Sequence, residues 1–127
     1  WIGRLGAAKT LPPWLSQQDL DYFVDQFSRA GFRGGVNYYR NFQHNWEISE
    51  HLQGVKVPVP TLFIAGARDS VIHGADQAQL QAAMSRVVPD LRGVILFPDA
   101  GHWIQQELPQ LTNEEVLIFL QVLQQST

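Results

Sequence analysis

The stretch Thr61-Leu62-Phe63-Ile64-Ala65 decides the fold class, together with a second stretch of the same character, Gly93-Val94-Ile95-Leu96-Phe97. Both runs are mainly apolar without alternating polar residues, a pattern typical of strands buried on both faces of a parallel sheet. Helical apolar spacing follows each run, over residues 74–86 and over residues 112–124, where Thr112 begins a capping-box pattern. The order strand, helix, strand, helix predicts a parallel β-α-β-α unit.

The first half of the chain has a helical pattern instead. Residues 1–15 contain glycines and a Pro-Pro pair, and we interpret them as a loop. Ser16 is followed three residues later by an acid, as in a capping box, so we expect a helix that begins there and ends near Gly31. After a predicted turn at residues 32–35, an aromatic-rich stretch predicts a second helix over residues 36–49.

A change in composition separates the two halves. Gly54 closes the helical pattern, and the connector that follows contains Pro58 and Pro60. We therefore predict two parts, a helical segment of residues 1–54 and an α/β unit of residues 55–127.

Composition bounds the class of protein. The 127 residues are 45% hydrophobic and 17% charged, which favours a buried core over disorder. The net charge is −3 without any basic run, so we expect no nucleic-acid partner. The absence of cysteine excludes disulfides and thiolate metal sites. No apolar run approaches the roughly 18 residues that span a membrane, and the N-terminus lacks a signal-peptide layout, so we expect no membrane span and a cytoplasmic protein.

Two loops carry the candidate chemistry. Residues 66–70 follow the first predicted strand and residues 98–102 follow the second. The carboxyl ends of parallel strands meet at the edge where ligands bind, so Asp69 and His102 are expected to touch. A histidine that acts as a general base needs a carboxylate to hold its tautomer, and this pair supplies both. Asp99 is the alternative acid, which we interpret as a turn residue.

Two motifs resemble a known family. Gly101-His102-Trp103 resembles the histidine loop of α/β-hydrolases, and Asn37-Tyr38-Tyr39-Arg40-Asn41 resembles the cap motif of soluble-type epoxide hydrolases. With the acid loop, the resemblance covers nearly the whole chain. It implies the C-terminal portion of an α/β-hydrolase fold, in which residues 1–54 are part of the helical cap, or lid, and residues 55–127 end the core.

The resemblance also implies roles for single residues. Tyr39 matches the cap tyrosine that hydrogen-bonds the epoxide oxygen, Asp69 matches the acid that orients the base, and His102 matches the base. Tyr38 falls where the family often has tryptophan. Adjacent helical residues diverge by about 100°, so we expect one of the two tyrosines to face the site. The expected substrate contacts are Tyr38, Trp103 and Val71.

The implied reaction is hydrolysis of a small apolar epoxide by water to a vicinal diol, through a covalent ester on an aspartate. In this fold the nucleophile precedes the acid and the histidine, and the sequence contains neither Gly-x-Asp-x-Gly nor Gly-x-Ser-x-Gly. We therefore expect the nucleophile on an upstream part of the same protein, and we expect this chain alone to be inactive. The resemblance implies no cofactor, and no His-x-x-x-His spacing indicates a metal site. A homodimer is left open.

Three alternatives share parts of this pattern. A haloalkane or haloacid dehalogenase uses the same acid and histidine with an aspartate nucleophile, but stabilises a halide instead of an alkoxide. A serine hydrolase of the same fold differs in its nucleophile. A non-catalytic binding module that keeps the cap is the third alternative, from a different class.

Overall fold

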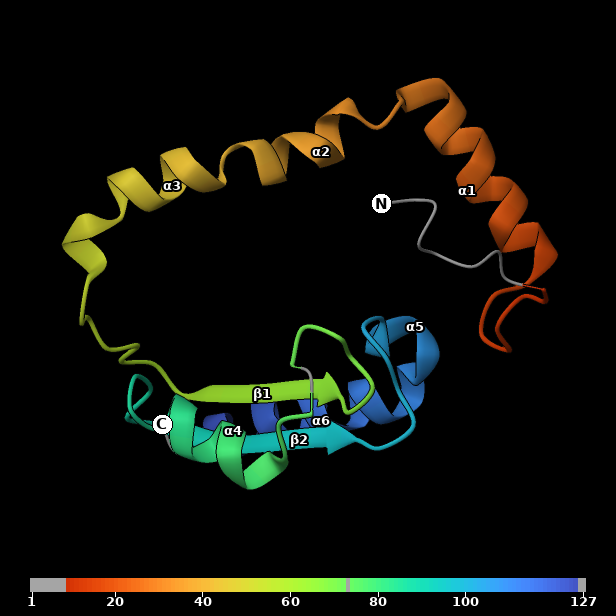
Figure 1. The fold of residues 1–127 in the computed structure, drawn as a ribbon. Helices are drawn as coiled ribbons and strands as arrows, with labels where there is room; N and C mark the ends of the chain where they lie inside the picture. The colour runs from red at the N-terminus through yellow and green to blue at the C-terminus, as the bar shows by residue number, and fades with distance from the viewer. Residues whose placement is uncertain (1–8, 73, 126–127) are drawn as a thin grey trace. The chain divides into compact units, whose positions relative to one another are not determined.

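The computed structural model describes residues 9–72 and 74–125, and it divides the chain into two compact units, Trp1–His51 and Leu52–Thr127 (Figure 1). Residues 1–8 of the predicted N-terminal loop lie outside the described part. The predicted division into a cap part and a core part concerns function and stays a prediction.

The first unit is helical, and its first helix begins as predicted. Helix α1 spans Gln17–Ala30, and the Ser16 hydroxyl accepts a hydrogen bond from the Asp19 backbone N–H at 3.1 Å. The Asp19 carboxylate accepts in return from the Ser16 backbone N–H at 3.1 Å. These bonds satisfy N–H groups that the first helical turn leaves free. Gly31 follows the last turn with φ 68°, a conformation that favours glycine.

The predicted turn at residues 32–35 is wrong, because helix α2 already begins at Arg33 and runs to Arg40. The Phe32 ring stacks on the Phe27 ring at 4.9 Å between centroids, which holds the chain close to α1. The Val36 backbone N–H then donates to the Phe32 carbonyl at 3.0 Å and starts the new helix.

The second predicted helix is interrupted. Asn41 separates α2 from helix α3, Phe42–Ile48, and its side-chain amide donates to the Asn37 carbonyl at 3.0 Å. An asparagine side chain that bonds nearby backbone competes with the helical hydrogen bonds, which explains the break. A short 3₁₀ helix, η2, follows at Glu50–Leu52.

The second unit contains the sheet, and it confirms the predicted parallel β-α-β-α order. Strands β1, Thr61–Gly66, and β2, Leu91–Phe97, pair in parallel, with helix α4, Gln77–Met84, between them in sequence. Helix α4 packs against β2 and helix α6, Pro109–Gln124, packs against β1, and Figure 1 shows α4 in front of the strands and α6 behind them. The register pairs Gly66 with Phe97, so both strands end at the same level.

The capping box predicted at Thr112 is wrong. Helix α6 begins at Pro109, whose fixed φ suits a first helical position, and Thr112 lies inside the helix. The Thr112 hydroxyl instead donates to the Ile104 carbonyl at 3.1 Å. Ile104 opens an unpredicted short helix, α5, which ends at Glu107. The bond ties α5 to α6.

The buried apolar residues of the described part all lie in the second unit. Three of them stand where the strands end or just beyond: Ala65, Phe97 and Ala100, at 8%, 7% and 1% exposure. Val88 and Val94 complete the set. The tightest packing therefore lies directly beneath the two loops that follow the strands. In the described residues, no helix is both long and apolar enough to cross a membrane.

Candidate active site

The two loops after the strands run side by side, and backbone hydrogen bonds join them. The Ala67 N–H donates to the Phe97 carbonyl and the Arg68 N–H donates to the Ala100 carbonyl, both at 2.9 Å. Gly66 allows this approach, because a Cβ atom there would lie 2.2 Å from the carbonyl oxygens of Ala100 and Gly101. The parallel pairing thus continues past the sheet and fixes one loop against the other.

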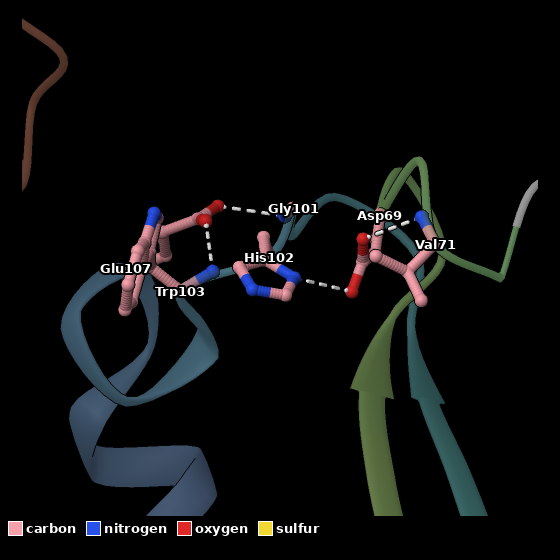
Figure 2. Close-up of polar contacts among 6 residues, drawn as sticks. All are labelled: Asp69, Val71, Gly101, His102, Trp103 and Glu107. Atoms are coloured by element: carbon pink, nitrogen blue, oxygen red, sulfur yellow. Dashed lines mark hydrogen bonds and ion pairs between the residues drawn. The ribbon is translucent and has the colours of Figure 1, made fainter. Parts of the chain in front are cut away.

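This junction brings Asp69 and His102 together (Figure 2). Nδ1 of His102 lies 2.8 Å from Oδ2 of Asp69, so the contact predicted from the loops is present. A carboxylate can only accept a hydrogen bond, so Nδ1 carries the hydrogen and Nε2 is left to accept a proton. The Asp69 side chain is 10% exposed and that of His102 is 56% exposed, so the imidazole is open to solvent while the carboxylate is sheltered.

The second carboxylate oxygen of Asp69 is also engaged. Oδ1 accepts a hydrogen bond from the Val71 backbone N–H at 2.8 Å. This bond first, and then the bond to His102, hold the pKa of Asp69 below its ordinary value, while burial opposes them. Asp69 therefore stays ionised and presents a fixed negative charge to the imidazole.

Asp99, the alternative acid, has a different partner. Its carboxylate pairs with the Arg68 guanidinium at 2.6 Å, and both side chains are exposed. Asp99 thus links the two loops on their outer side, whereas Asp69 bonds the histidine ring.

The second unit has a cavity of about 330 Å³ at this edge of the sheet. Asp69, His102 and Val71 all line it, which puts one predicted substrate contact beside the acid and the base. Trp103 does not belong to that lining; its ring meets the His102 ring edge-on, with 5.2 Å between centroids. A ligand in the cavity would contact Val71 directly, and Trp103 supports the imidazole.

The two candidate tyrosines lie on α2 in the first unit and have different surroundings. Tyr38 lines a hollow of about 240 Å³ together with three asparagines, and Tyr39 packs against Phe42 at 5.5 Å between ring centroids. Both are largely exposed, at 79% and 71%. Within this unit, both tyrosine side chains are therefore open to solvent.

Sequence reasoning missed two residues that shape the site. Glu107 accepts hydrogen bonds from the backbone on both sides of His102, and Gly66 makes the loop junction possible. A glycine directly after a buried strand is a usable sequence signal for Gly66. The role of Glu107 depends on the unpredicted helix α5. Within the described part, no group of three or more His, Cys, Asp or Glu side chains could hold a metal ion.

Comparisons with known sequences and with solved structures point to the same family. The chain is 41% identical over 122 residues to epoxide hydrolase A of Mycobacterium tuberculosis, which covers 94% of this chain and 36% of that protein. It is 36% identical over 114 residues to epoxide hydrolase 3 of Siraitia grosvenorii, covering 88% of this chain and 36% of the relative. No protein-family model matches.

Solved structures agree with the sequence relatives. The crystal structure of epoxide hydrolase A from Mycobacterium thermoresistibile matches 94% of this chain and 36% of its own length, with a TM-score of 0.84 and 40% identity. The chain thus spans about a third of the length of the proteins it matches and corresponds to their C-terminal part, and neither a dehalogenase nor a serine hydrolase is favoured. By sequence and by fold, this chain corresponds to the C-terminal part of epoxide hydrolases of the α/β-hydrolase superfamily.

Proposed function

We propose that this chain supplies the water-activating half of an epoxide hydrolase, and that the aspartate nucleophile lies on an upstream part of the same protein. The hydrogen bond between His102 Nδ1 and Asp69 Oδ2, 2.8 Å long, carries the proposal. It orients the imidazole and leaves Nε2 as the base, which is what hydrolysis of an ester intermediate requires.

The reaction has two steps. In the first, the upstream carboxylate attacks an epoxide carbon, the carbon–oxygen bond of the ring breaks, and Tyr39 donates a proton to the departing oxygen. A phenol with an ordinary pKa of about 10 stays protonated at neutral pH and can serve as this donor. In the second step, His102 Nε2 takes a proton from water, and the hydroxide attacks the ester carbonyl. The ester bond breaks, and the vicinal diol leaves with the upstream aspartate ionised. The proton held by His102 then returns through water to the Tyr39 phenolate, which restores the enzyme.

The substrate contacts of the proposal are apolar. Val71 lines the cavity beside His102 together with Phe63 and Ile72, so the favoured substrate is a small apolar epoxide. Tyr38 and Trp103 lie outside that lining, and their proposed contacts with the substrate rest on the resemblance to the family. We also place the protein in the cytoplasm, which cell fractionation would test. A homodimer is left open, and sedimentation of the full-length protein would test for it.

Substitution of the base tests the proposal most directly. In the full-length protein, His102→Gln is expected to stop the reaction at the ester and to slow diol formation about 100-fold or more, because no group then activates water. Mass spectrometry after mixing with an aryl epoxide should find the protein heavier by one epoxide. Full turnover by this variant would overturn the assignment of the base.

Tyr39 and the isolated chain provide the complementary measurements. Tyr39→Phe is expected to slow ester formation, since the phenol proton is missing, and unchanged epoxide turnover would refute its role. The isolated 127-residue chain is expected to form no diol, and diol formation by it would contradict the upstream position of the nucleophile.

A further inference from the structure

Glu107 holds the backbone around His102 from both sides. Its Oε2 accepts a hydrogen bond from the Gly101 N–H at 2.7 Å, and its Oε1 accepts one from the Trp103 N–H at 3.0 Å. Figure 2 shows this carboxylate on one side of the histidine and Asp69 on the other. The two donors are the backbone N–H groups of the residues that flank His102 in the sequence.

We propose that Glu107 is a positioning residue for His102, one that aims the imidazole at Asp69 and keeps Nε2 in place for attack by water. The inference rests on the proposed function for its kinetic consequence. The two bonds fix the Ala100–Gly101 and His102–Trp103 peptide groups, so they restrict the backbone torsions of Gly101 and His102. Only the two side-chain torsions of the imidazole then remain, and the bond to Asp69 fixes them.

The Glu107 carboxylate lies so close to Gly101 that a side chain at this position would crowd it. A Cβ atom at Gly101 would lie 3.1 Å from Oε1 of Glu107, tighter than ordinary van der Waals contact. Any larger residue there would push the carboxylate away by a few tenths of an ångström. The close approach of Glu107 therefore favours glycine at position 101 for a steric reason, apart from the hydrogen bonds.

Glu107 is itself anchored. Its backbone N–H donates to the Trp103 carbonyl at 2.8 Å, which closes the single turn of α5. The Thr112 hydroxyl, on α6, donates to the Ile104 carbonyl and holds α5 against the longer helix. Since α6 packs on β1, the carboxylate is connected to the sheet whose other loop carries Asp69. Acid and base are thus positioned from one framework.

The decisive test separates the two chemical steps in the full-length protein. Glu107→Gln keeps the size of the side chain but replaces one accepting oxygen by an NH₂ group, so one of the two backbone donors loses its partner. We expect the rate constant of ester hydrolysis to fall about 10-fold to 100-fold, because the base is misplaced. Ester formation does not use His102 and should change little, so the ester should accumulate in single-turnover experiments.

A matched control and a second variant sharpen the test. The Glu114 side chain is exposed on α6 and makes no hydrogen bond or ion pair in the described part, so Glu114→Gln should leave both steps unchanged. Gly101→Ala should slow hydrolysis less than Glu107→Gln, since the carboxylate only shifts. Combined with Glu107→Gln it should add little, because both changes act on the same contact.

Two outcomes would overturn the proposal. Unchanged ester hydrolysis in a folded Glu107→Gln variant would mean that the two hydrogen bonds to Glu107 do not position His102. An equal loss in both steps, together with a lower melting temperature, would mean that Glu107 only stabilises the fold.

If the unsubstituted full-length protein forms no diol, the proposed function fails. The positioning of His102 by Glu107 is then tested by NMR. Faster amide exchange at Gly101 and Trp103, and loss of the hydrogen-bonded Nδ1–H signal of His102 in Glu107→Gln, would support it. Unchanged exchange and an unchanged Nδ1–H signal would overturn it.

Discussion

The two units of this chain differ in what their apolar residues do. In the second unit, Val94 and Ala100 are only 3% and 1% exposed, and the strands and loops around them hold a defined pair of polar side chains. In the described residues of the first unit no side chain is buried, and α1 leaves Phe27 48% exposed along a regular apolar face. The helices of the first unit follow largely from local sequence pattern, with the Phe27–Phe32 ring stack beside it, whereas packing between elements forms the site of the second.

The difference shows what an amphipathic pattern implies. An apolar helical face predicts a helix and also predicts a surface to pack against. The epoxide hydrolases that match this chain are almost three times as long as the matched part, at 36% coverage. The exposed face of α1 is consistent with a chain that spans only part of such a protein.

The same glycine-to-alanine substitution should have opposite effects in the two units, and this is the largest expected difference. Gly66→Ala places a Cβ atom 2.2 Å from two backbone oxygens, so strand or loop must move, at a cost of about 3 kcal/mol or more. Gly35 lies in α2 with nothing within 4 Å of such an atom, so Gly35→Ala should stabilise by about 0.5 kcal/mol. Urea denaturation compares the two variants with the parent. Equal effects would remove the distinction between a packed loop junction and an open helix.

Truncation of one valine in each unit should give a smaller contrast. Val94→Ala leaves a void in the sheet and is expected to cost about 2 kcal/mol of unfolding free energy. Val24 on α1 is 57% exposed, so Val24→Ala should change stability by less than about 0.5 kcal/mol. Repeating the pair in the full-length protein sharpens the comparison, because a larger cost at Val24 there would show that another part of the protein covers α1.

Carboxylate titration should give the smallest contrast. The pKa of Asp69 is lowered first by the Val71 N–H and then by His102, and that of Asp19 is lowered first by the Ser16 hydroxyl and then by the Ser16 N–H. A folded pKa below the ordinary 3.8 means that each ionised group stabilises the fold above about pH 3.8, and that this contribution is lost as the pH falls through the folded value.

NMR titration of the two carboxyl carbons measures these shifts. His102→Ala should raise the pKa of Asp69 only part of the way to 3.8, because the Val71 N–H remains. Ser16→Ala should raise that of Asp19 further toward its ordinary value, since the hydroxyl is the larger cause. An Asp69 pKa that does not move in His102→Ala would contradict the hydrogen bond between the two side chains.

Residue patterns predicted much of the fold. The two apolar runs predicted both strands and their parallel order, and Ser16 predicted the start of α1, because these features depend on neighbours close in the sequence. The position of Asp69 and His102 after successive strands predicted their contact, since parallel strands end at one edge. The turn before α2 and the cap at Thr112 were predicted wrongly, because a ring stack and a contact between α5 and α6 outweighed local preference.

The order of the elements and the candidate acid–base pair were therefore set by local sequence, where periodicity and strand-following loops carry the information. The separate partners of Asp69 and Asp99, and the closure of Glu107 on the histidine loop, were set by the folded chain. These contacts depend on where backbone segments come within about 3 Å of one another, and hydrogen bonds weaken steeply beyond that distance. Residue types alone contain no such distances, so packing of the strands and of α5 against α6 had to supply them.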